Sequence, residues 1–422
     1  MEAQIHLIET ATRRMQRLGF MKYLMMRVSQ RATSSLQVLG NDLVQTVSRK
    51  VLVTASADLA EYVRLQKGKE TKNLLDRIET AMKQPMPRNT VLVELQDAYL
   101  ASPDLPSCSG KLVSSDWQNY PRLAVALGLL RKDSFSTLVR GQVLLKLITS
   151  NELGAFKEYS PNINPLALTL TQKLFFLFAF IENDRDVLLP LHRALLQTDG
   201  EFTDWQAGDL LPIILRELYR RIRPLAHTGT EILRLERLLQ TAAGIEQWRD
   251  KEYNGKGVRD ETATLRLEPL VDLGILQKKN RFSYRYEFTI AGRRFMTALT
   301  SDHDDGGYPD NEFFAKATDA FDLGITELLS EDQIIDLLVQ SYSMLASPLG
   351  YAPIREVLLL AALLAIESRK GFLELRTGSE MLRKLQQRYP NVVRFNVDRM
   401  GNLNFVKFTS MTLNAGLGQK GK

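Results

Sequence analysis

Few side chains in this 422-residue sequence have the types and spacing that catalysis requires. The four histidines are scattered, and no two of them lie four residues apart on one face of a helix: His6, His192, His227 and His303. Cys108 is the only cysteine, so the chain lacks the four Cys or His ligands that most structural zinc sites use. Because Cys108 lies in a Ser/Pro-rich segment, a nucleophilic Cys–His pair has no support there. We expect neither a zinc centre nor a cysteine hydrolase.

The densest acidic group comprises Asp302, His303, Asp304, Asp305 and Asp310. Oxygen ligands of this kind suit Mg²⁺ or Ca²⁺, but their spacing matches no EF-hand loop, and an acidic linker explains the composition equally well. The triplet Glu70-Thr71-Lys72 has the carboxylate and the lysine of a metal-dependent nuclease without a strand to present them. No Walker sequence is present. We therefore predict no catalytic residue, no metal and no cofactor, and a divergent nuclease ranks last among the functions considered.

The charges are unevenly distributed along the chain, although 55 basic and 49 acidic residues leave only +6 overall. Residues 1–50 hold eight basic and three acidic residues (net +5), and residues 300–341 hold eleven acidic residues and one lysine (net −10). Residues 369–422 hold eleven basic and three acidic residues (net +8). One interpretation is that solvated faces simply differ in sign. The other is a footprint for nucleic acid, with the acidic segment facing another protein or the chain's own basic surface.

The spacing of apolar residues predicts a mainly α protein with short β-hairpins, in the α+β class. Helices are expected over much of residues 1–100 and over 123–130, 170–181, 187–197, 205–221, 230–253, 261–273, 292–299, 354–368 and 379–389, with a helical pair in 313–346. Thr171 and Ser379 are the predicted N-caps of two of them. Four phenylalanines make helix 170–181 apolar almost all round, which favours a core helix over a cofactor site. Alternation predicts hairpins at 275–288 and 391–408.

Two segments share a pattern. Arg122-Leu123 precedes Leu127-Gly128-Leu129-Leu130-Arg131-Lys132, and Arg266-Leu267 precedes Leu273-Gly274-Ile275-Leu276-Gln277-Lys278. A polar or aromatic stretch follows each, and then a glycine that opens an apolar helix, Gly141 in the first and Gly292 in the second. A longer hairpin loop accounts for the wider gap between the glycines in the second copy.

This pattern resembles the winged-helix superfamily. In that superfamily a helix ends at a Leu-Gly-apolar-Leu corner, a two-stranded wing follows, and a phrase like Phe288-Thr289-Ile290-Ala291-Gly292 starts the closing helix. The corner glycine permits a left-handed C-cap. The resemblance covers roughly 30 to 40 residues in each copy and is more specific for fold than for function. The segment Ser379 to Phe408 is a weaker third candidate, because it lacks the corner glycine.

The resemblance also implies a DNA-contacting surface in the second copy. In winged helices the helix before the wing often enters the major groove, and wing side chains reach phosphates or the minor groove. The reading helix would carry Arg259, Thr262, Thr264 and Arg266, and the wing would carry Lys278, Lys279, Arg281 and Arg285. Cations are what a phosphate backbone attracts. The wing of the first copy is shorter and less basic. Many winged helices bind only proteins, so that alternative stays open.

These patterns divide the chain into six parts. They are an N-terminal helical region (1–87), a first winged-helix-like unit (88–160), a helical insertion with a second winged-helix-like unit (161–300), an acidic linker (301–312), a C-terminal helical domain ending in a helix and hairpin (313–410), and a flexible basic tail (411–422).

We expect a non-enzymatic protein that binds duplex DNA through its basic wings and tail, as one subunit of a larger bacterial DNA-processing or anti-phage defence assembly. The alternative is a scaffold or adaptor that binds other protein subunits without touching nucleic acid. We expect no small-molecule substrate. The apolar run 357–366 is shorter than the about 20 residues that span a bilayer, and no secretory leader is evident. A single cysteine cannot form an intrachain disulfide, so we expect a cytoplasmic protein without membrane contact.

Overall fold

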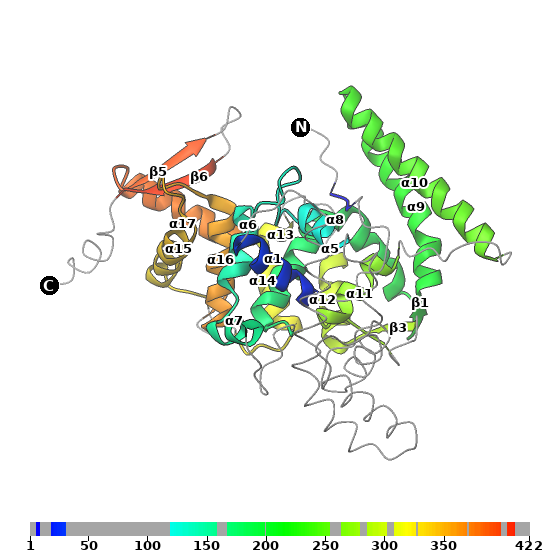
Figure 1. Cartoon of the computed structure of the whole chain (residues 1–422), viewed down its shortest axis with the longest axis horizontal. Coiled ribbons are helices and arrows are strands. Elements are labelled where there is room, and N and C mark those ends of the chain that lie inside the picture. The colour runs from blue at the N-terminus through cyan, green and yellow to red at the C-terminus, as the bar shows by residue number, and fades with distance from the viewer. Residues whose placement is uncertain are drawn as a thin grey trace, which may run out of the picture. The chain divides into compact units, whose positions relative to one another are not determined.

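The computed structural model divides the chain into two compact units. Unit 1 comprises Met1–Leu138 and Ile148–His303, and unit 2 comprises Val139–Leu147 and Asp304–Lys422. The structure describes residues 6–8, 18–30, 119–157, 167–198, 200–253, 263–278, 285–301, 308–325, 328–368, 371–397 and 403–409. Within these residues the protein is mainly helical, with two three-stranded antiparallel sheets (Figure 1). This agrees with the expected class.

The elements follow one another along the chain. Unit 1 contains α1 (Gly19–Gln30), α5 (Asn119–Ala126), α7 (Ser150–Lys157), α8 (Leu170–Leu196), β1 (Phe202–Thr203), α9 (Asp204–Ile222), the short 3₁₀ helix η2 (Arg223–Leu225), α10 (Gly229–Tyr253), the 3₁₀ helix η3 (Thr264–Arg266), α11 (Glu268–Asp272), β2 (Leu276–Lys278), β3 (Arg285–Phe288) and α12 (Ile290–Ser301). Unit 2 contains α6 (Val139–Lys146), α13 (Tyr308–Asn311), α14 (Phe313–Ala320), α15 (Glu331–Leu345), β4 (Ala352–Pro353), α16 (Ile354–Glu367), α17 (Leu375–Arg388), β5 (Val393–Val397) and β6 (Leu403–Phe408).

Helix α8 is the central core helix of unit 1. Its four phenylalanines are at most 2% exposed, which confirms the predicted core role. Thr169, rather than the predicted Thr171, is the N-cap, and it forms a capping box with Gln172. The helix also continues through residues 182–186, where the polar sequence predicts a break. Asp184 lies there at 0% exposure but is neutralised by Arg266, so the helix can bury it.

The N-terminal helix α1 lies in the interior of unit 1. Lys22 is fully buried, forms an ion pair with Glu152 of α7, and donates a hydrogen bond to the carbonyl oxygen of Ala167 (2.7 Å). Burial lowers the pKa of Lys22, although the hydrogen bond to Glu152 opposes that shift. The backbone N–H of Leu18 donates to the carboxylate of Asp272 (2.9 Å). These contacts join α1 and the residue before it to Glu152 and Asp272, which lie 130 and 254 positions later in the sequence than their partners.

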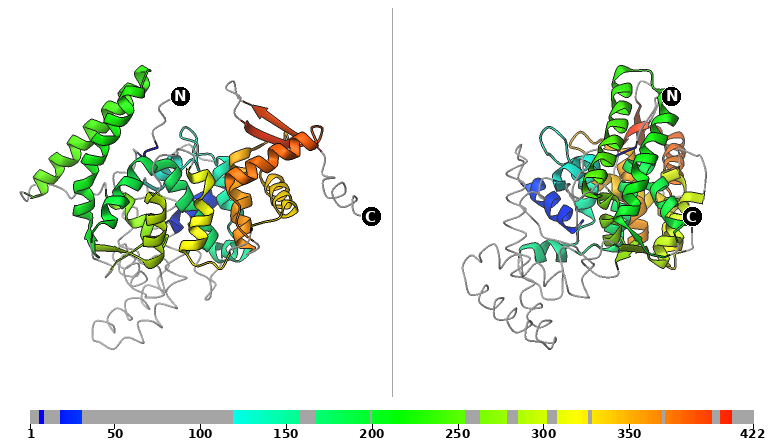
Figure 2. Two further views of the ribbon diagram at one scale, coloured as in Figure 1. Left: turned by 180° about the vertical axis from the view of Figure 1, so that it is seen from behind. Right: turned by 90° about the vertical axis from the view of Figure 1, so that its right-hand side faces the viewer.

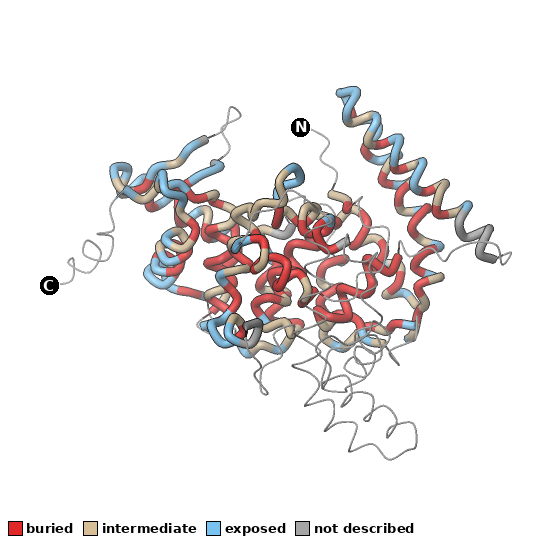
Figure 3. The backbone as a smooth tube through the Cα atoms, viewed as in Figure 1, coloured by how far each residue is buried: buried red, intermediate tan, exposed pale blue. Residues whose placement is uncertain are grey.

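The sheet of unit 1 has the strand order β1-β3-β2. Phe202 pairs with Tyr286, and Leu276 pairs with Phe288, so aromatic side chains cover one face. Helices α9 and α10 lie between β1 and α11 in sequence and pack along each other as a hairpin (Figure 2). Buried and exposed residues alternate along both of these helices (Figure 3).

The two corner glycines have the predicted left-handed backbone. Gly128 has φ 70° and Gly274 has φ 76°, which a residue with a Cβ adopts only with strain. The two copies differ after the glycine. Gly274 leads into the β2–β3 hairpin, whereas the chain after Gly128 forms only an isolated bridge between Leu130 and Thr137 in the described residues.

The sheet of unit 2 has the order β4-β6-β5, and the helices α15, α16 and α17 belong to the same unit. Strands β5 and β6 confirm the hairpin predicted at 391–408. Helix α17 begins four residues before the predicted cap Ser379. Its N-cap residue is Glu374, and its first turn packs closely on α16, because a Cβ at Gly378 would lie 2.6 Å from a methyl group of Leu358.

The segment predicted as an acidic linker is partly structured. Helix α13 lies inside the range 301–312, and Asp310 in it forms an ion pair with Arg355 of α16. The division between the two units, after His303, also falls in this range. Among the described residues, no helix is long and apolar enough to cross a membrane.

Candidate nucleic-acid interface

The eight residues expected to contact DNA do not form one exposed surface. Arg259, Thr262, Lys279 and Arg281 lie outside the described residues. Of the other four, Thr264 is 2% exposed, and the side chains of Arg266 and Lys278 are at most 5% exposed. Only Arg285 has an exposed side chain, which lies 3.6 Å from the carboxylate of Glu201.

Arg266 joins three parts of unit 1 instead of reaching solvent. Its Nε lies 2.7 Å from Oδ2 of Asp184, and its Nη2 donates to Oδ1 (2.9 Å) and to the carbonyl oxygen of Ile8 (3.3 Å). Asp184 also accepts the N–H of Ile8 (2.9 Å). Burial raises the pKa of Asp184, and the guanidinium of Arg266 opposes that rise. The DNA-reading role expected for Arg266 is corrected to an internal ion pair between η3, α8 and the N-terminal segment.

Lys278 is also held inside the fold. Its ammonium group forms an ion pair with Glu268 and lies 5.1 Å from the centre of the Tyr286 ring. The Tyr286 hydroxyl donates to the same carboxylate (2.6 Å). Because Thr264, Arg266 and Lys278 are buried, the expectation that these three side chains face DNA is corrected: they stabilise the sheet and the helices around it.

Several cations of unit 2 lie on α17 and on the β5–β6 hairpin, and unit 1 carries exposed cations as well. The described residues from 371 to 409 contain six basic side chains and two acidic ones: Arg376, Arg383, Lys384, Arg388, Arg394 and Lys407, against Glu374 and Glu380. Glu374 is buried, so Glu380 is the only exposed carboxylate in these residues. Lys384 is paired with Glu331 of α15 (3.2 Å), which reduces the positive excess on this surface.

The hairpin presents its polar residues on one side. Arg394 pairs with Lys407 and Asn396 with Phe405 across the two strands, so these four share a face, while Val393 and Val406 point to the core. Phe405 is 39% exposed on the outer face. An exposed aromatic ring beside cations is a surface on which a base can stack.

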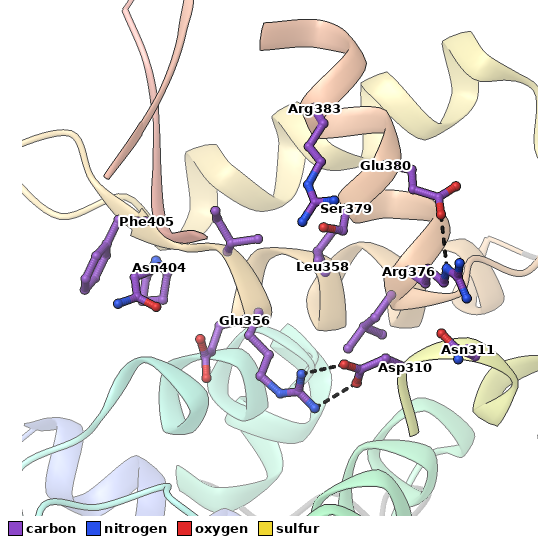
Figure 4. A pocket seen from close by; sticks show the side chains of 14 residues that line it. Asp310, Asn311, Glu356, Leu358, Arg376, Ser379, Glu380, Arg383, Asn404 and Phe405 are labelled. Carbon is purple, nitrogen blue, oxygen red and sulfur yellow. Dashed lines mark hydrogen bonds and ion pairs between the residues drawn. The ribbon is translucent and has the colours of Figure 1, made fainter. Parts of the chain in front are cut away.

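An open groove of about 770 Å³ lies beside α17 (Figure 4). Arg376, Ser379, Glu380 and Arg383 line it from α17, Asn404 and Phe405 from β6, Arg355 and Glu356 from the first turn of α16, and Asp310 and Asn311 from α13. All of these residues belong to unit 2. The groove is thus bounded by the helix and the hairpin that carry these cations.

The cations of the groove differ in their pairing. Arg355 binds Asp310 through both terminal nitrogens, at 2.8 and 3.0 Å, and Arg376 donates to Glu380 at 3.1 Å (Figure 4). Arg383 has no such partner among the described residues. Its guanidinium points back along α17 toward Ser379 (Figure 4). An exposed guanidinium without a carboxylate partner is available to an incoming anion.

The groove has the side chains of a binding site. Guanidinium, amide and aromatic groups can hold an anion and a planar ring, and within the described part of the chain no three His, Cys, Asp or Glu residues are grouped to hold a metal ion. The carboxylates that could transfer protons are paired with arginines. The arrangement favours recognition of a charged partner.

Glu374 links two helices next to this groove. It is the N-cap residue of α17, and its carboxylate accepts the backbone N–H groups of Ala315 (2.6 Å) and Phe314 (3.3 Å) at the start of α14. Burial raises its pKa to about 7, while these two hydrogen bonds act in the opposite direction.

We expect Glu374→Gln to change the pH dependence of stability. A carboxyl group with a raised pKa in the folded state favours folding at low pH and loses that contribution as the pH rises through about 7. The variant should therefore gain about 2 kcal/mol in unfolding free energy relative to the wild type between about pH 5.5 and 8.5. Urea unfolding at several pH values measures this difference. Glu380→Gln, exposed on the same helix, is the control and should show no such trend.

The sequence contains a signal for α17 that the expected site did not use. Buried Leu375, Leu382 and Leu385 recur at helical spacing, and the basic residues lie between them. This segment ranked third among the winged-helix candidates because it lacks a corner glycine. A scan against protein-family models found no match to this chain, and neither did a search of curated proteins or a search of solved structures.

Proposed function

We propose that unit 2 is a winged-helix module that binds nucleic acid, and duplex DNA in particular, through α17 and the β5–β6 hairpin. The order of its elements supports this assignment: α15, β4, α16, α17, β5 and β6 follow one another, and the strands pair as β4-β6-β5. In this arrangement α17 has the position of the reading helix, and β5 and β6 form the wing. The observation that carries the proposal is the set of exposed cations on these elements.

Unit 1 contains a sheet with the same strand order, for which we infer a different role. Its strands pair as β1-β3-β2 around α11, with α9 and α10 inserted as a hairpin before that helix. Every residue of α11 is buried, so this helix has no free face to place in a groove of DNA. We infer that the winged-helix-like part of unit 1 serves the core, and that unit 2 makes the nucleic-acid contact.

The proposed binding is electrostatic and depends on salt. Each phosphate neutralised by a cation releases condensed counterions, so the affinity falls by roughly 0.9 log unit per contact for each tenfold rise in salt. Four or five contacts from α17 and the hairpin would give a slope of about −4 on a log–log plot. A scaffold that binds only proteins would show no such dependence.

The test is a double charge reversal of Arg383→Glu and Arg394→Glu in the full chain. Both side chains are exposed, one on α17 and one on β5, so the fold should be retained. We expect the affinity for a duplex of arbitrary sequence to fall about 30-fold or more and the salt slope to decrease by about two. Fluorescence anisotropy between about 50 and 200 mM salt measures both quantities.

The matched control makes the same charge change at the end of α9 and the start of η2. Arg220→Glu with Arg223→Glu reverses two exposed cations of unit 1 and should leave the affinity within about threefold of wild type. Equal losses in the two double variants would show that net charge alone governs binding, which contradicts the proposed interface. A wild-type chain that binds no duplex at low salt would favour the scaffold alternative.

A further inference from the structure

One carboxylate lies inside the groove against a cation that phosphate would otherwise attract. Asp310 of α13 contacts both terminal nitrogens of Arg355, with Oδ1 at 2.8 Å from Nη2 and Oδ2 at 3.0 Å from Nη1. The two side chains are 37% and 39% exposed, so solvent reaches both partners. Figure 4 shows Asp310 below α17, with dashed lines for its contacts to the guanidinium.

The geometry of this pair is also that of a phosphate contact. A guanidinium presents two parallel N–H donors, and a carboxylate or two phosphate oxygens accept them in the same forked arrangement. Asp310 therefore occupies the donors that a phosphodiester group would use. Arg355 lies in the first turn of α16, and Arg376 and Arg383 of α17 line the same groove, so a backbone that follows α17 passes close to it.

The exchange of Asp310 for phosphate has a moderate cost, because the displaced carboxylate stays in the groove near the phosphate. A half-exposed ion pair contributes little to stability, because water screens it, and the incoming phosphate replaces the hydrogen bonds that the carboxylate gives up. The other acidic residue that lines the groove from α16, Glu356, has its own partner in Arg140 at 3.4 Å and is only 16% exposed. It is therefore less free to leave its partner than Asp310.

We propose that Arg355 is a phosphodiester-binding subsite of the groove and that Asp310 is its internal competitor. This inference rests on the proposed function of unit 2 and adds to it a residue that limits the affinity. Neutralising Asp310 removes the carboxylate that competes with a phosphate group for these two Arg355 donors. The subsite then contributes one additional phosphate contact, which the salt dependence reports directly.

The test is a double-mutant cycle of Asp310→Asn and Arg355→Ala in the full chain, with a nonspecific duplex as the probe. Asp310→Asn should bind about tenfold more tightly than wild type, with a salt slope steeper by about one. Arg355→Ala should weaken binding a few-fold, because it leaves Asp310 as an unpaired negative charge in the groove. The double variant should return to within about twofold of wild type in both affinity and slope.

Two controls separate this subsite from a general effect of charge. Asp319→Asn removes an exposed negative charge from α14, outside the groove, and should change the affinity less than twofold. Asp310→Glu keeps the charge and should bind like wild type. A gain in Asp319→Asn equal to that in Asp310→Asn, or a gain that persists in the double variant, would overturn the inference. The same holds if Asp310→Asn lowers the melting temperature without changing the affinity.

Failure of the subsite and failure of the proposed function give different results. If the wild type binds the duplex with the expected salt slope and Asp310→Asn shows no gain, the subsite is wrong and the proposed interface stands. If neither the wild type nor any variant binds the duplex, both the proposed function and the subsite are wrong.

Discussion

Replacing Gly292 by alanine is expected to lower the unfolding free energy of unit 1 by about 3 kcal/mol or more. A Cβ at this position would lie 1.9 Å from the carbonyl oxygen of Ile275 and 2.5 Å from its carbonyl carbon. Both atoms belong to the backbone, so no side-chain rotation relieves the clash. The same carbonyl accepts the N–H of Thr289 (3.1 Å), and the Thr289 hydroxyl accepts the N–H of Gly292 (2.8 Å). The methyl group would therefore disturb the start of α12 as well.

Gly244→Ala on α10 is the matched control for this prediction. No atom lies within 4 Å of the Cβ that it would add, and the helical backbone suits alanine better than glycine. This variant should be more stable than wild type by about 0.5–1 kcal/mol. Thermal and urea unfolding of the two variants measure the contrast. A Gly292→Ala protein as stable as the wild type would show that α12 does not approach Ile275 as closely as described.

Arg266→Ala is expected to destabilise the protein by about 3–5 kcal/mol, because it leaves a charged carboxylate alone in the core. Asp184 is 0% exposed and, among the residues that the structure describes, would keep only the N–H of Ile8 as a hydrogen-bond donor. With the guanidinium gone, the pKa of Asp184 should rise further, because burial is no longer opposed. Urea unfolding at neutral and at acidic pH measures both effects, and the loss should be smaller in acid.

Arg285→Ala is the control for Arg266→Ala. The Arg285 side chain is 64% exposed and lies 3.6 Å from Glu201, so its loss should cost less than about 0.5 kcal/mol. Replacing both partners, as in Arg266→Met with Asp184→Leu, should recover much of the stability, since the buried charge is then removed. An Arg266→Ala protein that unfolds like wild type but binds DNA less tightly would restore the role expected from the sequence.

Local patterns were sufficient to predict much of the fold. The apolar helix 170–181, the hairpin at 391–408 and the left-handed glycines at 128 and 274 depend on side chains and backbone close in sequence. The cap at Ser379 was wrong: the helix begins after Glu374, and its first turn packs on Leu358 of α16, a contact that no local pattern shows.

The candidate site was less predictable, because burial of a cation depends on distant partners. Arg266 lies in a segment whose polar and basic residues are typical of a reading helix. Asp184, 82 positions earlier, nevertheless pairs with it in the core. The sequence position of Lys278 predicts a wing cation, but Lys278 is buried beside Glu268 and Tyr286. Arg383 carried the same kind of charge, and only the packing of unit 2 distinguishes it as exposed.

The burial of α1 has a consequence for synthesis on the ribosome. Lys22 and Leu18 have partners at Glu152 and Asp272, so the helix cannot reach its final place until residue 272 has left the exit tunnel. At about 5–20 residues per second, the interval between synthesis of α1 and synthesis of residue 272 is on the order of 10–50 seconds. During that time the apolar side chains of Met21, Leu24 and Met25 remain without their final contacts. We therefore expect chaperones that bind apolar helices to bind the nascent chain during this interval.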